Sequence, residues 1–172
     1  MKGSDMMQED PRFVHGGNVY EPTADGEPWL DFSANINPLG LSPRVKEVIA
    51  AHIDEVIHYP DPAMRELRAA LSTYYDRAPS DFILGNGAAE LFYLYAFVMR
   101  PKRVLLPVPA FSEYERAAHA AGAAVSYSPL EERAGFEPDL IFLAEEAQRV
   151  QADCIVLGNP NNPTGTLVER EA

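Results

Sequence analysis

The spacing of apolar and polar residues changes near residue 80. Beyond it, short apolar runs alternate with segments of about ten residues whose apolar positions recur at helical spacing. Strands that alternate with such helices predict crossover connections and a largely parallel sheet, so the expected fold class is α/β. The expected strands are 82–84, 104–108, 123–127 and 154–157, and the expected helices are 88–99, 112–121 and 140–150.

The first sixty residues are dominated by turn signals. The segments His15-Gly16-Gly17-Asn18 and Asp25-Gly26 are typical of turns. The segment Asn35-Ile36-Asn37-Pro38-Leu39-Gly40 cannot be regular structure, because Pro38 and Gly40 interrupt it. The run 29–33 has the composition of a short strand. We therefore expect a loop-rich arm at the start of the chain.

Two helices are expected next, each opened by a capping residue followed by proline. The pairs are Ser42-Pro43 and Asp61-Pro62, and apolar residues follow both at helical spacing. The later helix 88–99 is apolar nearly all round, which predicts that it is buried. The expected organisation is an arm with part of a small domain over residues 1–60, and a larger domain over 61–172.

Composition narrows the class of protein. The chain has 172 residues, 47% of them hydrophobic and 23% charged, which is typical of a globular protein. No apolar run reaches the roughly 20 residues of a membrane-spanning helix, and the polar start resembles no targeting segment. A single cysteine, Cys154, excludes an intramolecular disulfide and a cysteine-based metal site. The expected location is the cytoplasm.

The net charge of the chain limits the kinds of partner that it can bind. Acidic residues outnumber basic ones, so the formal net charge is −12 and the pI about 4.7. Nucleic-acid binding needs a basic surface for phosphate contacts, so a nucleic-acid partner is not expected. Small anions remain compatible, because helix N-termini and a few side chains can hold them.

Gly85-Asn86-Gly87-Ala88-Ala89-Glu90 lies between an expected strand and an expected helix. Small residues allow close backbone approach, and the helix N-terminus adds partial positive charge, so a phosphate fits there. A dinucleotide-binding loop would have glycine in place of Glu90 and an acidic residue about twenty positions on. This chain lacks both features, so a dinucleotide-binding loop is not favoured. A plain tight turn capped by Gly87 stays the alternative.

Three more segments could carry chemistry. Asn159–Gly165 follows an expected strand at its carboxyl end, where open α/β sheets bind ligands, although a plain turn is the alternative. In Pro107–Tyr114, the loop residue Phe111 could stack on a planar ring, whereas Tyr114 suits core packing. In His58-Tyr59-Pro60-Asp61-Pro62, packing or a surface role is the simpler interpretation of each ring.

Together these segments resemble the fold-type-I pyridoxal-phosphate enzymes of the class I/II aminotransferase family. Within it, the chain is similar to the histidinol-phosphate aminotransferase-like branch. His15–Asn18 and Asp31–Pro38 look like threonine-phosphate decarboxylases of cobalamin biosynthesis, since the aminotransferases usually have Asn-Glu-Asn-Pro where this chain has Asn35-Ile36-Asn37-Pro38. The matching motifs are Gly-Asn-Gly-Ala-Ala-Glu, Pro-x-Phe-Ser-x-Tyr, Tyr-Pro-Asp-Pro and Asn-Pro-Asn-Asn-Pro-Thr-Gly.

The resemblance implies a partial three-layer αβα large domain that binds pyridoxal 5′-phosphate. Backbone N–H groups of Gly87, Ala88 and Ala89 would hold the cofactor phosphate. Phe111 would stack on the pyridine ring. Asn162 would form a hydrogen bond with the phenolic oxygen of that ring.

The resemblance also implies a homodimer and a small phosphorylated amino-acid substrate. Tyr59 would reach the cofactor phosphate bound by the other subunit. His15 and Asn35 would lie near the substrate, with His15 a candidate for its phosphate group.

The chain departs from the family in one respect. The family has a Schiff-base lysine, an aspartate facing the pyridine nitrogen and an arginine for the substrate carboxylate, all in a further segment of similar length. Here the lysines are Lys2, Lys46 and Lys102, and none follows Asn162. We therefore expect the amino-terminal half of such an enzyme, with no catalytic residue and no activity alone.

Several functions stay open at this stage. The favoured one is a threonine-phosphate decarboxylase-like enzyme, which would break the bond from the α-carbon to the carboxylate. An aminotransferase of histidinol phosphate or another amino acid would break the α-hydrogen bond instead. A non-catalytic remnant that binds a partner, or an isolated phosphate-binding α/β domain, is the alternative of another class.

Overall fold

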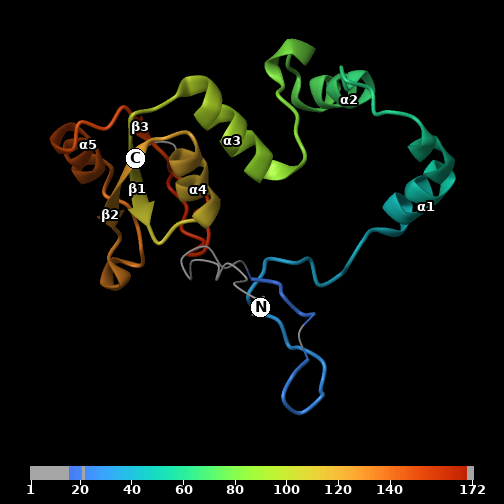
Figure 1. Cartoon of the computed structure of the whole chain (residues 1–172), viewed down its shortest axis with the longest axis horizontal. Helices are drawn as coiled ribbons and strands as arrows, with labels where there is room; N and C mark the ends of the chain where they lie inside the picture. The colour runs from blue at the N-terminus through green and yellow to red at the C-terminus, as the bar shows by residue number, and fades with distance from the viewer. Residues whose placement is uncertain (1–15, 21, 170–172) are drawn as a thin grey trace, which may run out of the picture. The chain divides into compact units, whose positions relative to one another are not determined.

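The computed structural model describes residues 16–20 and 22–169. The chain divides into two compact units, Met1–Ile83 and Leu84–Ala172, which are described separately (Figure 1). His15, a predicted substrate residue, lies outside the described residues. The assignment of residues 61–172 to one cofactor-binding domain stays a prediction. No helix in the described ranges is long and apolar enough to cross a membrane.

The first unit contains loops and short helices. In chain order these are α1 (Pro43–Ala51), the 3₁₀ helix η2 (Ile53–Ile57), α2 (Arg65–Tyr75) and the 3₁₀ helix η3 (Pro79–Asp81). The predicted strand at 29–33 is wrong. Asp31 Oδ1 instead accepts hydrogen bonds from the N–H and O–H of Ser33, at 2.8 and 2.5 Å, so the backbone forms a local turn.

The two predicted helix starts differ in outcome. α1 begins at Pro43 with Ser42 as its N-cap residue, although the serine side chain makes no capping bond. α2 begins at Arg65, later than the Asp61-Pro62 signal predicts, because Met64 takes a left-handed conformation with φ 48°. Asp61 still caps this start, because its carboxylate accepts the N–H of Arg65 at 2.9 Å.

The second unit is a parallel α/β fold, which confirms the predicted class. Its sheet has the order β2-β1-β3, and β1 pairs in parallel with both neighbours. Helices α4 and α5 lie on opposite sides of this sheet (Figure 1), as right-handed crossovers in the two directions require. The elements are α3 (Gly87–Met99), β1 (Arg103–Val108), α4 (Ser112–Ala120), β2 (Ala124–Pro129), η4 (Glu132–Ala134), α5 (Leu140–Arg149) and β3 (Cys154–Ile155).

The core of this unit is the central strand β1. Leu105 is 0% exposed, and its neighbours Val104 and Leu106 are also buried. Buried Ala117 and Ala118 on α4 and Leu143 on α5 complete the core from the two helix layers.

Asp153 fastens the start of β3 to the start of β1. Its carboxylate accepts hydrogen bonds from the backbone N–H groups of Lys102, at 2.9 Å, and Arg103, at 3.0 Å. These two donors hold the pKa of Asp153 below its ordinary value. Lys102 therefore lies at the amino edge of the sheet.

The strand predicted at 82–84 is wrong, since no strand of the described sheet pairs with it. The carbonyl of Phe82 accepts a hydrogen bond from the Arg68 guanidinium, so a side chain satisfies it in place of a neighbouring strand. The last strand is also shorter than predicted, because only Cys154 and Ile155 pair with β1.

The predicted burial of helix α3 is also wrong. Within the described residues only Ala96 is buried, and Val98 is 77% exposed. One face of α3 packs on α4, where the Phe92 and Tyr114 rings meet, and the described residues leave the remaining apolar surface largely uncovered.

Candidate functional site

The N-terminus of α3 presents free backbone donors. Asn86 is the N-cap residue, and its side chain makes no capping bond. Gly87 has φ +82°, a conformation suited to glycine, and its own N–H donates to the Gly85 carbonyl at 3.0 Å. The N–H groups of Ala88 and Ala89 meet no acceptor among the described residues. Two of the three predicted donors are therefore available to an anion, while that of Gly87 is engaged.

Glu90 closes the other side of this turn. Its Oε2 accepts the N–H of Asn86 at 2.5 Å, which occupies one donor of the helix start. A Cβ on Gly85 would lie 2.8 Å from this oxygen and 3.0 Å from Leu91 Cδ2, so a larger residue there would displace the Glu90 carboxylate or the Leu91 side chain. This contact has a signal in the sequence, because a glutamate three positions after the start of a helix is typical of a capping interaction.

Phe111 ends the loop after β1 and is the N-cap residue of α4. Its half-buried ring packs edge-on against Phe92, with centroids 6.4 Å apart, and against Tyr114, at 5.7 Å. The Phe92 and Tyr114 rings themselves are 4.8 Å apart. These contacts fix the orientation of Phe111 and place the first turns of α3 beside the loop after β1.

The loop after β3 uses two of its three asparagines for structure. Asn159 forms two hydrogen bonds with the backbone of Val168, at 3.0 and 2.9 Å. Asn161 donates to the Pro109 carbonyl at 3.0 Å and to Thr164 at 2.8 Å. Asn162 is exposed, and in the described part of the chain its side chain makes no hydrogen bond. Asn162 is therefore the asparagine available to a ligand.

The bond from Asn161 to Pro109 joins the loops after β3 and β1. Pro109 is two residues before Phe111, so Phe111 and Asn162 share the carboxyl edge of the sheet. The contact of Phe111 with Phe92 adds the start of α3 to the same neighbourhood. The three predicted segments of the second unit thus come together.

A buried carboxylate supports this arrangement and was missed from the sequence. Glu113 on α4 is only 7% exposed and accepts a hydrogen bond from Arg116 Nη1 at 2.9 Å. Burial, together with the Glu113 charge, raises the pKa of Tyr93 on α3. The Tyr93 side chain of α3 therefore lies close to this carboxylate of α4. The sequence pattern of α4 does not show which of its charged residues is buried, so the burial of Glu113 was not predicted.

An apolar cavity of about 250 Å³ lies between α3, α4 and β3, and its lining includes Ala96, Val104 and Cys154. Burial raises the pKa of the Cys154 thiol, so the thiolate is disfavoured at neutral pH. The lining carries no charged side chain, so this cavity offers no counter-charge for an anion. No group of three metal-binding side chains occurs in the described ranges.

The other predicted site residues belong to the first unit. Tyr59 is 99% exposed, and Asn35 is also exposed. The segment after His15 packs on Ser33, whose Oγ accepts the Gly17 N–H at 2.8 Å. A Cβ on Gly16 would overlap the Ser33 carbonyl, so this close approach needs glycine.

The residues of the second unit suit pyridoxal phosphate. Ala88 and Ala89 offer two N–H groups at a helix N-terminus, which is a favourable place for a phosphate. Phe111 offers an oriented ring and Asn162 an amide donor on the same edge. Lys102 lies at the opposite edge of the sheet, and Lys46 lies on α1 in the first unit.

Residues 27–172 match the family model described as aminotransferase class I and II. The chain is 36% identical to a threonine-phosphate decarboxylase from Salmonella typhimurium, covering 91% of this chain and 44% of that protein. It is 39% identical to a histidinol-phosphate aminotransferase from Sphingopyxis alaskensis, covering 86% of this chain and 40% of that protein.

Solved structures agree. The crystal structure of the histidinol-phosphate aminotransferase from Clostridium acetobutylicum matches with a TM-score of 0.69 and 33% identity, covering 81% of this chain and 40% of that one. The chain thus spans less than half the length of these relatives. The chain belongs to the class I and II aminotransferase family, whose cofactor is pyridoxal 5′-phosphate.

Proposed function

We propose that this chain supplies the phosphate-binding and ring-binding part of an enzyme that resembles threonine-phosphate decarboxylase. One observation carries the proposal: the open N-terminus of α3 lies beside Phe111 and shares the carboxyl edge of the sheet with Asn162. Such an edge is where α/β folds bind ligands.

Each residue has a distinct role in this proposal. Ala88 and Ala89 donate their N–H groups to the cofactor phosphate, and Gly87 keeps the approach to them open. Phe111 stacks on the ring and sets its plane, while Asn162 donates to the phenolic oxygen. Bound pyridoxal phosphate supplies a ring that takes up the electrons released when a bond to the substrate α-carbon breaks.

The decarboxylase assignment is supported by the first unit. The segments that resemble the decarboxylase, 15–18 and 31–38, are joined by the hydrogen bond from Gly17 to Ser33. In this proposal His15 and Asn35 contact one substrate, with a phosphate group as the ligand of His15. The 36% identical relative from Salmonella typhimurium carries that name.

A histidinol-phosphate aminotransferase is the second candidate, favoured by the 39% identical relative from Sphingopyxis alaskensis. Both candidates use a small phosphorylated amino compound, in a homodimer that brings Tyr59 to the partner's cofactor. An assay of an enzyme that includes this chain and the cofactor-binding lysine would distinguish the two candidate functions. Carbon dioxide release from threonine phosphate supports the decarboxylase, and a carbonyl product without carbon dioxide supports the aminotransferase.

The 172-residue chain itself is expected to bind pyridoxal phosphate without a covalent bond and to show no turnover. Its lysines are Lys2, Lys46 and Lys102, and Lys102 lies at the edge opposite Asn162. The measurement is a titration monitored by absorbance, followed by borohydride reduction and peptide mass mapping.

We expect saturable binding with no stoichiometric adduct after reduction. A single stoichiometric adduct on Lys46 or Lys102, together with carbon dioxide release from threonine phosphate, would contradict the proposed roles. Absence of saturable binding would favour a remnant or an interaction protein over a cofactor-binding chain.

A further inference from the structure

Tyr59 sits on a stiff piece of backbone, and its ring is exposed. The sequence Tyr59-Pro60-Asp61-Pro62 has proline at every second position, which fixes two φ angles and restricts the residue before each proline. The tyrosine is nonetheless 99% exposed. An aromatic residue that is held by its backbone and open to solvent is suited to contact a ligand or a second molecule.

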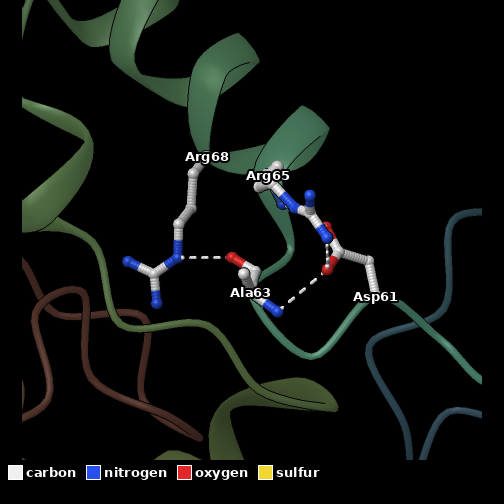
Figure 2. A network of polar contacts seen from close by, with 4 residues as sticks. All are labelled: Asp61, Ala63, Arg65 and Arg68. Carbon is white, nitrogen blue, oxygen red and sulfur yellow. Dashed lines mark hydrogen bonds and ion pairs between the residues drawn. The ribbon is translucent and has the colours of Figure 1, made fainter.

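Asp61 strengthens this backbone with four hydrogen bonds. Its carboxylate accepts the N–H groups of Ala63, at 3.1 Å, and Arg65, at 2.9 Å (Figure 2). The Arg65 guanidinium adds a two-pronged contact, at 3.0 Å for both Nε and Nη2. These donors hold the pKa of Asp61 well below its ordinary range, so the carboxylate stays charged at neutral pH.

Arg68 connects the Tyr59 loop, residues 59–63, to residues 79–82 of the first unit. Its Nε donates to the Ala63 carbonyl at 3.1 Å (Figure 2). Its Nη1 donates to the carbonyls of Pro79, at 3.2 Å, and Phe82, at 2.5 Å. One guanidinium thus joins the Tyr59 loop to the segment that follows helix α2.

The geometry of arginine explains why this position needs it. The guanidinium is planar and carries five donors in a fixed arrangement, and hydrogen bonds from a charged donor are strong. The three acceptors are backbone carbonyls on both sides of α2, so the contact fixes backbone positions directly. A lysine ammonium is a compact charge that cannot reproduce this fork.

From this geometry we infer that Arg68 is a positioning residue for Tyr59, and that it acts on cofactor binding through that tyrosine. The inference rests on the proposed function, in which Tyr59 contacts the cofactor phosphate bound by a second copy of the chain. Arg68 keeps the Tyr59 loop in the place that this contact requires. Loss of the guanidinium would free the loop, and the hydroxyl would spend less time on the phosphate.

The test is a double-mutant cycle in the full chain, with pyridoxal phosphate as the titrant. The variants are Arg68→Gln, Tyr59→Phe and their combination. The matched control is Arg77→Gln, which removes the same charge just beyond α2 and contacts none of the three carbonyls. Arg68→Lys is the conservative variant. Amide hydrogen exchange in the segments 61–64 and 79–82 shows, independently of the cofactor, whether Arg68 still holds these two segments together.

We expect Arg68→Gln and Tyr59→Phe each to weaken binding by about tenfold, the size of one hydrogen bond to a charged group. The double variant should be no weaker than either single variant, because both remove the same contact. Arg68→Lys should recover part of the loss, and Arg77→Gln should bind normally. Exchange should quicken in both segments in the two variants that carry Arg68→Gln, and it should not change in Tyr59→Phe.

Four results would overturn the inference. Unchanged binding by Arg68→Gln, with weakened binding by Tyr59→Phe, removes the positioning role and leaves the proposed function intact. Unchanged binding by Tyr59→Phe, with normal binding by the wild-type chain, removes the positioning role and also the Tyr59 contact of the proposed function. Additive losses in the double variant would show that Arg68 acts on binding independently of Tyr59. If the glutamine variant unfolds, the same comparison uses Arg68→Lys. A wild-type chain that does not bind the cofactor defeats the proposed function and this inference together.

Discussion

Gly87→Asp is expected to weaken pyridoxal-phosphate binding by about a hundredfold or more. The new carboxylate would lie at the helix N-terminus, beside the Ala88 and Ala89 N–H groups that are assigned to the phosphate. Two unit charges about 4 Å apart near a protein surface repel each other by about 4 kcal/mol, and the phosphate carries more than one charge. Titration of the purified variant measures the loss.

Gly87→Asn is the matched control for charge. Asparagine has nearly the shape of aspartate, and both tolerate the positive φ of Gly87 better than other side chains. No atom lies within 4 Å of a Cβ at this position, so either residue has space. The asparagine variant should therefore bind far better than the aspartate variant.

Asn162→Ala sets the scale for a single neutral contact. It removes one hydrogen bond to the ring, worth about 1 kcal/mol, so its loss should be about fivefold. Equal losses for Gly87→Asp and Gly87→Asn, or a larger loss for Asn162→Ala, would argue against a phosphate at the start of α3.

Leu105→Ala should destabilise the second unit by about 2–5 kcal/mol. Leu105 is 0% exposed and occupies the middle of β1, the strand that pairs with both others. Its removal loses apolar burial and leaves a cavity between the sheet and its helices. Domains are commonly stable by only about 5–15 kcal/mol, so this is a large fraction. Urea unfolding followed by circular dichroism gives the change in midpoint.

Leu167→Ala is the corresponding control in the same unit. The same atoms are removed from a side chain that is 54% exposed, so the midpoint should move far less. Similar midpoints for both variants would show that the β1 core does not stabilise this unit. A change in the slope with urea would indicate an altered unfolded state instead.

Local patterns were sufficient to predict the elements of the second unit. The apolar run at 104–108 and the helical spacing in α4 and α5 each carry their own signal, and the structure has these elements within a few residues of the predicted bounds. The parallel arrangement followed from the alternation of these elements. No distant contact was needed for any of these steps.

Elements that depend on a partner were not predictable in this way. A strand at 82–84 needs a neighbouring strand, and Phe82 instead gives its carbonyl to Arg68, which is fourteen residues earlier. An apolar helix is buried only where something covers it, and within the described residues α4 covers one face of α3. The start of α2 shifted because Met64 takes a left-handed conformation that composition does not reveal.

In the candidate site, too, the sequence predicted the local features but not those that depend on contacts between distant residues. The sequence placed a phosphate-type turn before α3, but the bond from the Gly87 N–H to Gly85 appears only in three dimensions. The motif contains several asparagines, and only the contacts of Asn159 and Asn161 leave Asn162 as the available one. A buried support such as Glu113 depends on how α3 and α4 pack together.

The most direct measurement is a nuclear magnetic resonance titration of the ¹⁵N-labelled chain with pyridoxal phosphate. The largest changes should fall on the backbone amides of Ala88 and Ala89, with smaller changes at Phe111 and the Asn162 side-chain amide. Inorganic phosphate alone should shift the two alanine amides and leave Phe111 and Asn162 nearly unchanged. Saturable shifts confined to other segments, or no shifts at all, would contradict the claim that the start of α3 holds the cofactor phosphate.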